Sequence, residues 1–190
     1  MEIRPTFPAR LELGKGAVLR AIHPDDADAV YALVDESREH LRAWLPWVDT
    51  SQSAACTREF FEHVVEQRER HATAAYLILE HGRIAGMIGL HDIDWTNRGF
   101  LIGYWIAARA EGQGLITRSC RALVKLAFEE WGMERAVIQC GVGNGRSSAV
   151  ARRLGFTLEG VARHAQLLHG EFIDLQVWSL LRVEHEPRRS

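Results

Sequence analysis

Two glycines, Gly112 and Gly114, flank a glutamine just before a long amphipathic segment. Glycine adopts positive φ angles without strain and allows a ligand to approach the backbone closely, so this pair leaves several N–H groups able to point at one spot. The helix expected after Gly114 adds the positive end of its dipole there. The stretch therefore predicts an anion site, and phosphate is the anion most often held in this way.

Two common phosphate-binding loops do not fit this stretch. A Walker loop needs Lys and then Ser or Thr directly after its last glycine, where this chain has two apolar residues. A dinucleotide fingerprint needs a third glycine at the position of Thr117 and an early βαβ unit. The pattern that remains is Arg109-x-x-Gly112-x-Gly114, after an apolar run and before a helix.

Composition limits the classes of function. The chain has 190 residues, of which 47% are hydrophobic and 25% charged, and this suits a single domain over residues 1–190. A net charge of −2 offers no basic surface for nucleic acid. No apolar run reaches the roughly 20 residues that span a bilayer, and no secretory signal opens the sequence. The three cysteines lack a paired metal spacing. We therefore expect a cytoplasmic protein with no membrane or direct nucleic-acid partner.

Hydrophobic periodicity predicts the elements that must position the glycine pair. The first third reads as one strand followed by helices, with a tryptophan-rich segment broken at Pro46. The rest reads as three antiparallel strands, a helix, a strand, a second helix and a closing hairpin. The expected strands lie near 17–22, 74–79, 84–93, 98–108, 135–142, 156–168 and 171–182, and the expected helices near 24–35, 54–71, 114–131 and 144–154.

From Ala17 to Arg182, the chain resembles the GNAT superfamily of N-acetyltransferases. The glycine loop, the strand IGYWI before it and the segment NGRSSAVARRLGF after the next strand carry the resemblance. The early REHLRAWLPWVD and the late FIDLQVWSLL are similar to the Rim-type branch, which acetylates the N-termini of ribosomal proteins. The resemblance implies an acetyltransferase domain over residues 17–182.

The implied fold class is α+β (α/β). In this family a mixed, strongly twisted and mostly antiparallel sheet, here of about seven strands, carries helices on both faces. Its fourth and fifth strands splay into a V that holds the pantetheine arm of acetyl-CoA. The resemblance therefore implies acetyl-CoA as co-substrate and no metal. It assigns acetyl-CoA binding to Tyr104, Trp105, Ile106, Arg109, Gly112, Gln113, Gly114, Leu115 and Asn144.

The same resemblance assigns the proton transfers. The serine of the family's N-x-x-S motif, here Ser147, would protonate the leaving thiolate, although a simple first-turn position after an Asn144 N-cap is the alternative. The Rim branch has a glutamate where this chain has Gln166, whose amide accepts no proton. If the segment is a strand, His164 lies two residues away on the same face and becomes the candidate base. A water chain to the solvent is the alternative.

Three functions remain open from the sequence. The first is acetyl transfer to the N-terminal α-amino group of a ribosomal protein by direct attack on the thioester. The second is the same reaction on a small amine, such as a polyamine, an aminoglycoside or an aminoacyl compound, and the third is a non-catalytic acyl-CoA sensor. We expect Trp44, Trp47 and Gln166 to contact the acceptor, although tryptophans also pack without a ligand. An open groove beside the tryptophans favours a peptide, and a deep acidic pocket favours a small cation. Whether the chain forms a homodimer is left open.

Overall fold

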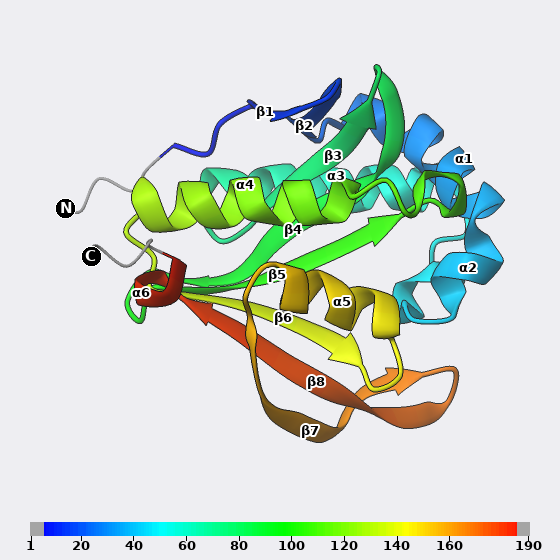
Figure 1. Ribbon diagram of the computed structural model, residues 1–190. Helices are drawn as coiled ribbons and strands as arrows, with labels where there is room; N and C mark the ends of the chain where they lie inside the picture. The colour runs from blue at the N-terminus through cyan, green and yellow to red at the C-terminus, as the bar shows by residue number, and fades with distance from the viewer. Residues whose placement is uncertain (1–5, 186–190) are drawn as a thin grey trace.

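The computed structural model describes residues 6–185, and one eight-stranded sheet runs through its centre (Figure 1). The strand order is β1-β2-β3-β4-β5-β6-β8-β7, and every neighbouring pair is antiparallel except β5 and β6. The strands are β1 Arg10–Gly14, β2 Ala17–Ala21, β3 Ala74–Glu80, β4 Arg83–Asp94, β5 Gly99–Ile106, β6 Arg135–Gly141, β7 Thr157–Leu168 and β8 Glu171–Leu181.

The helices begin close to where their local chemistry predicts. Pro24 opens the first turn of the N-terminal helical region, Ser53 caps α3 and Asn144 caps α5. No helix in the described residues is long and apolar enough to cross a membrane. The helices are α1 Ala27–Glu36, α2 Arg38–Arg42, α3 Ala54–Glu69, α4 Leu115–Glu129, α5 Gly145–Arg153 and α6 Arg182–His185, with 3-10 turns η1 Pro24–Asp26, η2 Pro46–Asp49 and η3 Ala108–Ala110.

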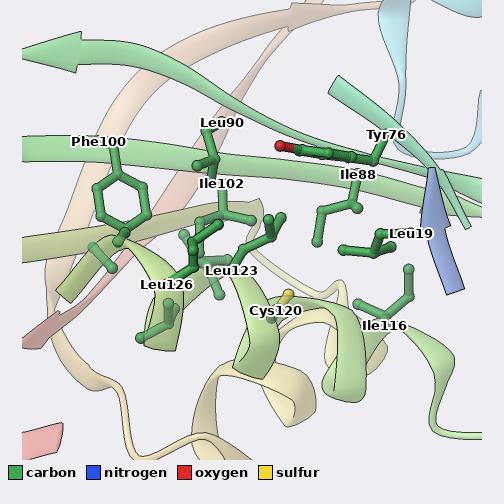
Figure 2. Close-up of a cluster of buried hydrophobic side chains, with 14 of the residues drawn as sticks. Leu19, Tyr76, Ile88, Leu90, Phe100, Ile102, Ile116, Cys120, Leu123 and Leu126 are labelled. Carbon is green, nitrogen blue, oxygen red and sulfur yellow. The ribbon is translucent and has the colours of Figure 1, made fainter. Parts of the chain in front are cut away.

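Two hydrophobic cores cover the two faces of the sheet. Side chains alternate across a strand, and in β3 the buried Tyr76 belongs to the core under α4 while Leu77 belongs to the core under α1 and α3. Figure 2 shows the first core, where Ile116, Cys120 and Leu123 of α4 point toward the strands. The expectation of a mostly antiparallel sheet with helices on both faces is confirmed.

The sheet has eight strands instead of the expected seven, because the sequence analysis missed β1. Only Leu11 and Leu13 alternate in this short strand, which gives a weak period-2 signal. The turn that joins β1 to β2 carries positive φ angles at Gly14, Lys15 and Gly16. The hairpin therefore depends on a tight turn whose middle residue, a lysine, gives no sequence signal for it.

The two central strands β5 and β6 separate soon after they meet. Residues 99–101 of β5 pair with residues 135–137 of β6, but β5 continues to Ile106 and β6 to Gly141 without further pairing between them. Each strand keeps its outer neighbour, β4 or β8, over most of its length. The V expected between the fourth and fifth of seven strands is confirmed at β5 and β6.

One glycine of β4 allows the end of β5 to lie in this position. A Cβ added to Gly86 would lie 2.3 Å from the carbonyl oxygen of Trp105 and 2.9 Å from the Cα of Ile106. Because both are backbone atoms, we expect Gly86→Ala to lower the free energy of unfolding by about 1–3 kcal/mol, measured by chemical denaturation. Gly99→Ala is the control, since its added Cβ meets nothing closer than 3.9 Å. Equal effects in the two variants would show that the close approach at Gly86 is not the cause.

Candidate active site

The splayed strands open onto a cleft of about 1010 Å³. Its walls come from the ends of β5 and β6, the β1–β2 turn, the loop before α4, the first turn of α4, one side of α5, the segment around α2, and one residue of β7. In Figure 1, α4 and α5 both begin on the side of the sheet where α2 lies. The predicted site residues that line the cleft are Trp44, Tyr104, Trp105, Ile106, Gly112, Gln113, Gly114, Leu115, Asn144, Ser147 and Gln166.

The glycine loop has the geometry predicted for an anion site. Gly112 has φ 75° and Gly114, the N-cap of α4, has φ 71°. A Cβ at either position would meet nothing within 4 Å, so both Cα atoms face open space. The first-turn N–H groups of α4 have no intrahelical partners. An anion in the cleft can therefore approach both the loop and the positive end of the helix dipole.

Positive side chains surround this end of the cleft. Lys15 reaches it from the β1–β2 turn, and Arg118 of α4 donates to the Gly14 carbonyl at 2.8 Å while lining the same space. Arg146 and Arg153 of α5 line it as well. The sequence analysis missed Lys15, because about 100 residues separate it from the glycine loop. Four cations around a loop of backbone donors fit a ligand that carries several phosphate charges.

A hydrogen bond between Tyr104 of β5 and Ser147 of α5 crosses the V. Asn144 Oδ1 accepts from the Ser147 N–H at 3.1 Å, so the expected N-cap is confirmed. Ser147 Oγ lies 2.8 Å from the Tyr104 hydroxyl, and either oxygen could be the donor. Burial raises the pKa of Tyr104 well above its ordinary value, so the phenol stays protonated. The pair can therefore supply a proton to an atom inside the cleft.

Trp44 forms the part of the cleft wall that lies against the end of β6. A Cβ on Gly141 would lie only 3.1 Å from the Trp44 ring, so the indole rests directly on the end of β6. The residue is 36% exposed and its carbonyl accepts from the Gln166 side chain at 3.4 Å. Trp44 and Gln166 therefore lie together at the cleft, as expected for residues that contact an acceptor.

A second contact holds the β7–β8 hairpin against the same segment. His169 in the hairpin turn places Nε2 2.7 Å from the Arg42 carbonyl and Nδ1 3.1 Å from the Asp49 carboxylate. Arg42 also pairs with Asp49 at 2.6 Å, and this guanidinium, followed by His169, lowers the pKa of Asp49. The wall that carries Trp44 is thus tied to the hairpin by side chains more than 100 residues apart.

Two residues predicted to contact a ligand, Arg109 and Trp47, are not among those that line the cleft. Arg109 turns away from it, donating to the Ile84 carbonyl at 3.1 Å with Nε 3.8 Å from Glu36. Trp47 lies behind the wall, with its ring 6.2 Å from that of Trp105. Arg109 therefore anchors the loop to its surroundings, and Trp47 supports a strand residue that does line the cleft.

The predicted base, His164, also does not line the cleft. The β7–β8 pairing is irregular between Ala162 and Gln166, and His164 has a positive φ of 51°. Its N–H donates to Asp174 at 2.8 Å, and its ring stacks on the exposed Phe172. Strand alternation fails across such a bulge. The two-residue spacing from Gln166 therefore does not bring His164 into the cleft.

The structure adds a charged cluster that the sequence analysis missed. Glu111, inside the glycine loop, lies 3.1 Å from Arg146 and 3.2 Å from His40 Nε2. All three side chains line the cleft. His40 precedes Trp44 by four residues, and this helical spacing was the available signal that both face the same way. Within residues 6–185, no three His, Cys, Asp or Glu side chains are grouped so that they could hold a metal ion.

Comparison with known proteins agrees with this geometry. The family model described as an acetyltransferase (GNAT) domain matches residues 17–157. The putative ribosomal N-acetyltransferase YdaF of Bacillus subtilis is 38% identical over 174 residues, which cover 90% of this chain and 94% of that protein.

Two solved structures share the fold with a TM-score of 0.88 each. One is RimL, the ribosomal L7/L12 α-N-protein acetyltransferase, in complex with coenzyme A, at 29% identity with 93% of this chain and 99% of that chain covered. The other is the microcin C7 self-immunity acetyltransferase MccE in complex with acetyl-CoA and AMP, at 26% identity with 92% and 97% covered.

The glycine loop can be tested with acetyl-CoA as the ligand. A methyl group at Gly114 would project into the space that a phosphate needs, so we expect Gly114→Ala to weaken acetyl-CoA binding about tenfold in calorimetry. The matched control is Gly82→Ala in the β3–β4 turn, where φ is 78° and a Cβ also meets nothing within 4 Å. Both variants carry similar backbone strain. An equal loss of affinity in the two would remove the loop from the binding site.

Proposed function

The chain belongs to the acetyltransferase (GNAT) domain family, and from this premise we propose that it acetylates the N-terminal α-amino group of a ribosomal protein. Its general activity is acetyl-CoA-dependent acetyl transfer, so the sensor hypothesis is not retained. The observation that carries the choice of acceptor is the charge of the cleft. Among the described residues that line it, Glu111 is the single carboxylate, and Arg146 and His40 already contact it.

The described residues fit acetyl-CoA along the V. Beyond Leu101, β5 has no strand partner on the side of β6, so its backbone groups at 104–106 are free for an extended ligand. The glycine loop and the start of α4 suit a pyrophosphate, and Lys15, Arg118 and Arg153 suit the remaining phosphate charge. Acetyl-CoA supplies the activated acetyl group, and the protein supplies the binding, orientation and proton transfers around it.

The cleft does not suit a polycationic acceptor. A polyamine or an aminoglycoside carries several positive charges, which a site must match with carboxylates. Here four cations line the cleft and Glu111 is engaged by Arg146 and His40. A protein N-terminus carries one charge on an α-amino group, whose pKa of about 8 is well below that of a lysine side chain. Such an amine needs the least help to become a neutral nucleophile.

The acceptor wall also suits a peptide. Trp44 offers a half-exposed ring beside the Gln166 amide, and an extended chain could use both through apolar contact and hydrogen bonding. Two of the similar proteins carry names that refer to ribosomal acetylation, one of them at the α-amino group of L7/L12. These similarities and the side chains of the wall both support the N-terminal α-amino group of a ribosomal protein as the acceptor.

A second candidate acceptor is an aminoacyl nucleotide. Trp44 lines the cleft and is 36% exposed, and indole rings stack well on nucleobases. The similar MccE structure contains AMP together with acetyl-CoA. An aminoacyl nucleotide also carries one α-amino group, so the charge of the cleft alone does not distinguish it from a peptide.

The acceptor is tested by a competition assay read by mass spectrometry. We expect acetylation of a serine-initiated ribosomal peptide at its α-amino group, with spermidine, kanamycin and an aminoacyl-adenylate analogue acetylated at least about 10²-fold less efficiently in kcat/KM. The same peptide with a blocked N-terminus and a free lysine is the control and should stay unmodified. A higher kcat/KM for spermidine or for the adenylate analogue would overturn the proposed acceptor.

The Ser147–Tyr104 pair gives a further prediction. If Ser147 protonates the leaving thiolate, Ser147→Ala should lower kcat about 10²-fold and Tyr104→Phe about tenfold, with acetyl-CoA affinity nearly unchanged. Because burial raises the pKa of Tyr104, its phenol remains protonated up to and beyond its ordinary pKa of about 10. Activity should therefore show no loss from tyrosine ionisation at neutral or mildly alkaline pH. Wild-type kcat in Ser147→Ala would return Ser147 to a purely structural position.

A further inference from the structure

Acetyl transfer needs a proton acceptor that the sequence analysis did not find. The attacking amine must lose a proton before or as its nitrogen bonds to the acetyl carbon. Gln166 lines the cleft but its amide accepts no proton, and His164 lies outside it. Apart from a water chain to the solvent, the proton acceptor can come only from the other described side chains that line the cleft.

Elimination leaves two such side chains. The lysine and the arginines that line the cleft are already protonated. Tyr104 stays protonated because burial raises its pKa, and the Cys140 thiol is oriented as a donor toward Gln176 at 3.8 Å. The remaining candidates, His40 and Glu111, contact each other at 3.2 Å.

We propose that His40 is the proton acceptor of the reaction and that Glu111 positions it. The Nε2 atom of His40 lies 3.2 Å from the Glu111 carboxylate, and with its proton on Nε2 the imidazole has a lone pair on Nδ1 that can accept a proton. This arrangement has the logic of a carboxylate–histidine pair, in which the carboxylate fixes the tautomer and stabilises the imidazolium. Both side chains are 26% exposed, so the pair reaches the cleft as well as the solvent.

The proton balance follows from this geometry. As the amine nitrogen bonds to the acetyl carbon and the C–S bond breaks, one of the N–H protons moves to His40 Nδ1 and the leaving thiolate receives a proton from Ser147. The imidazolium, balanced by Glu111, then gives its proton to water and the Ser147 oxygen takes one from water, so the protein ends in the protonation state in which it began. His40 also precedes Trp44 by four residues, and both line the cleft. The base thus belongs to the same wall as the proposed acceptor contacts.

The charges around His40 come from four elements. Glu111 lies in the glycine loop, and Arg146 at the start of α5 shares its carboxylate. Arg109 of the same loop pairs with Glu36 of α1 at 3.8 Å, and Glu39 precedes His40 on α2. Arg146 and His40 compete for the same Glu111 carboxylate. Removing the Arg146 side chain should therefore strengthen the contact between Glu111 and His40.

The test compares pH profiles of kcat/KM for four proteins with a serine-initiated peptide as acceptor. We expect His40→Gln to lower kcat about 10²-fold and to lose the limb of the profile that reports the base, with acetyl-CoA affinity unchanged. Glu111→Gln should lower kcat about tenfold and move that limb, as expected for a positioning residue. His164→Gln, an exposed histidine of β7 outside the cleft, is the matched control and should keep the wild-type profile.

A rescue experiment separates a chemical role from a structural one. Added imidazole should restore part of the activity of His40→Ala, because a small base can occupy the space left by the ring. The inference requires only acetyl transfer to an amine, so the adenylate analogue replaces the peptide if the competition assay favours it. A His40→Gln enzyme that keeps its profile and its kcat within twofold, or a His40→Ala enzyme that is inactive and not rescued by imidazole, would overturn the role of His40.

Discussion

The separation of β5 from β6 is the constraint on which the site depends. The two strands pair over three residues each and then diverge, although each keeps a partner on its outer side. An interior strand that loses its partner leaves backbone N–H and C=O groups unpaired, and these groups need water or a ligand. The unpaired part of β5 lines the same cleft as the first turn of α4, whose N–H groups have no intrahelical partners. The same geometric feature therefore creates the space, the backbone donors and the electrostatic field of the cleft.

The sequence predicted those parts of the site that local chemistry specifies. Gly112 and Gly114 need no distant partner to adopt positive φ, and Asn144 caps its own helix through the N–H of Ser147. The buried face of α4 follows from 3.6-residue periodicity alone, and Cys120 and Leu123 lie where it placed them. Resemblance to a family supplied what local chemistry does not, namely the V and its ligand.

The parts that could not be predicted depend on contacts across the chain. Lys15 enters the cleft only because β1 pairs with β2 and the turn between them reaches α4 through Arg118. Arg109 fits the motif by spacing, yet a carbonyl of β4 draws it away from the cleft. His164 shows a different limit, because the two-residue rule holds for a regular strand and a bulge cancels it. A bulge has no signal in a sequence that lacks the expected glycine or proline.

The two walls of the cleft are built in different ways, and this separates cofactor binding from acceptor choice. The side that we propose for acetyl-CoA combines backbone donors at two strand–helix junctions with cationic side chains, and a side-chain substitution there leaves the backbone donors in place. The opposite wall is a short helix and a 3-10 turn, held in place by Gln166 and His169 of a distant hairpin. Side-chain contacts hold this wall more than backbone hydrogen bonds do. A substitution in it can therefore change which acceptor binds without disturbing the sheet. His40 lies where the walls meet, since it belongs to α2 and contacts the glycine loop through Glu111. A proton acceptor at that junction contacts the glycine loop through Glu111 and belongs to the same segment as Trp44. The contact that positions the base therefore also links the side proposed for acetyl-CoA to the side proposed for the acceptor amine.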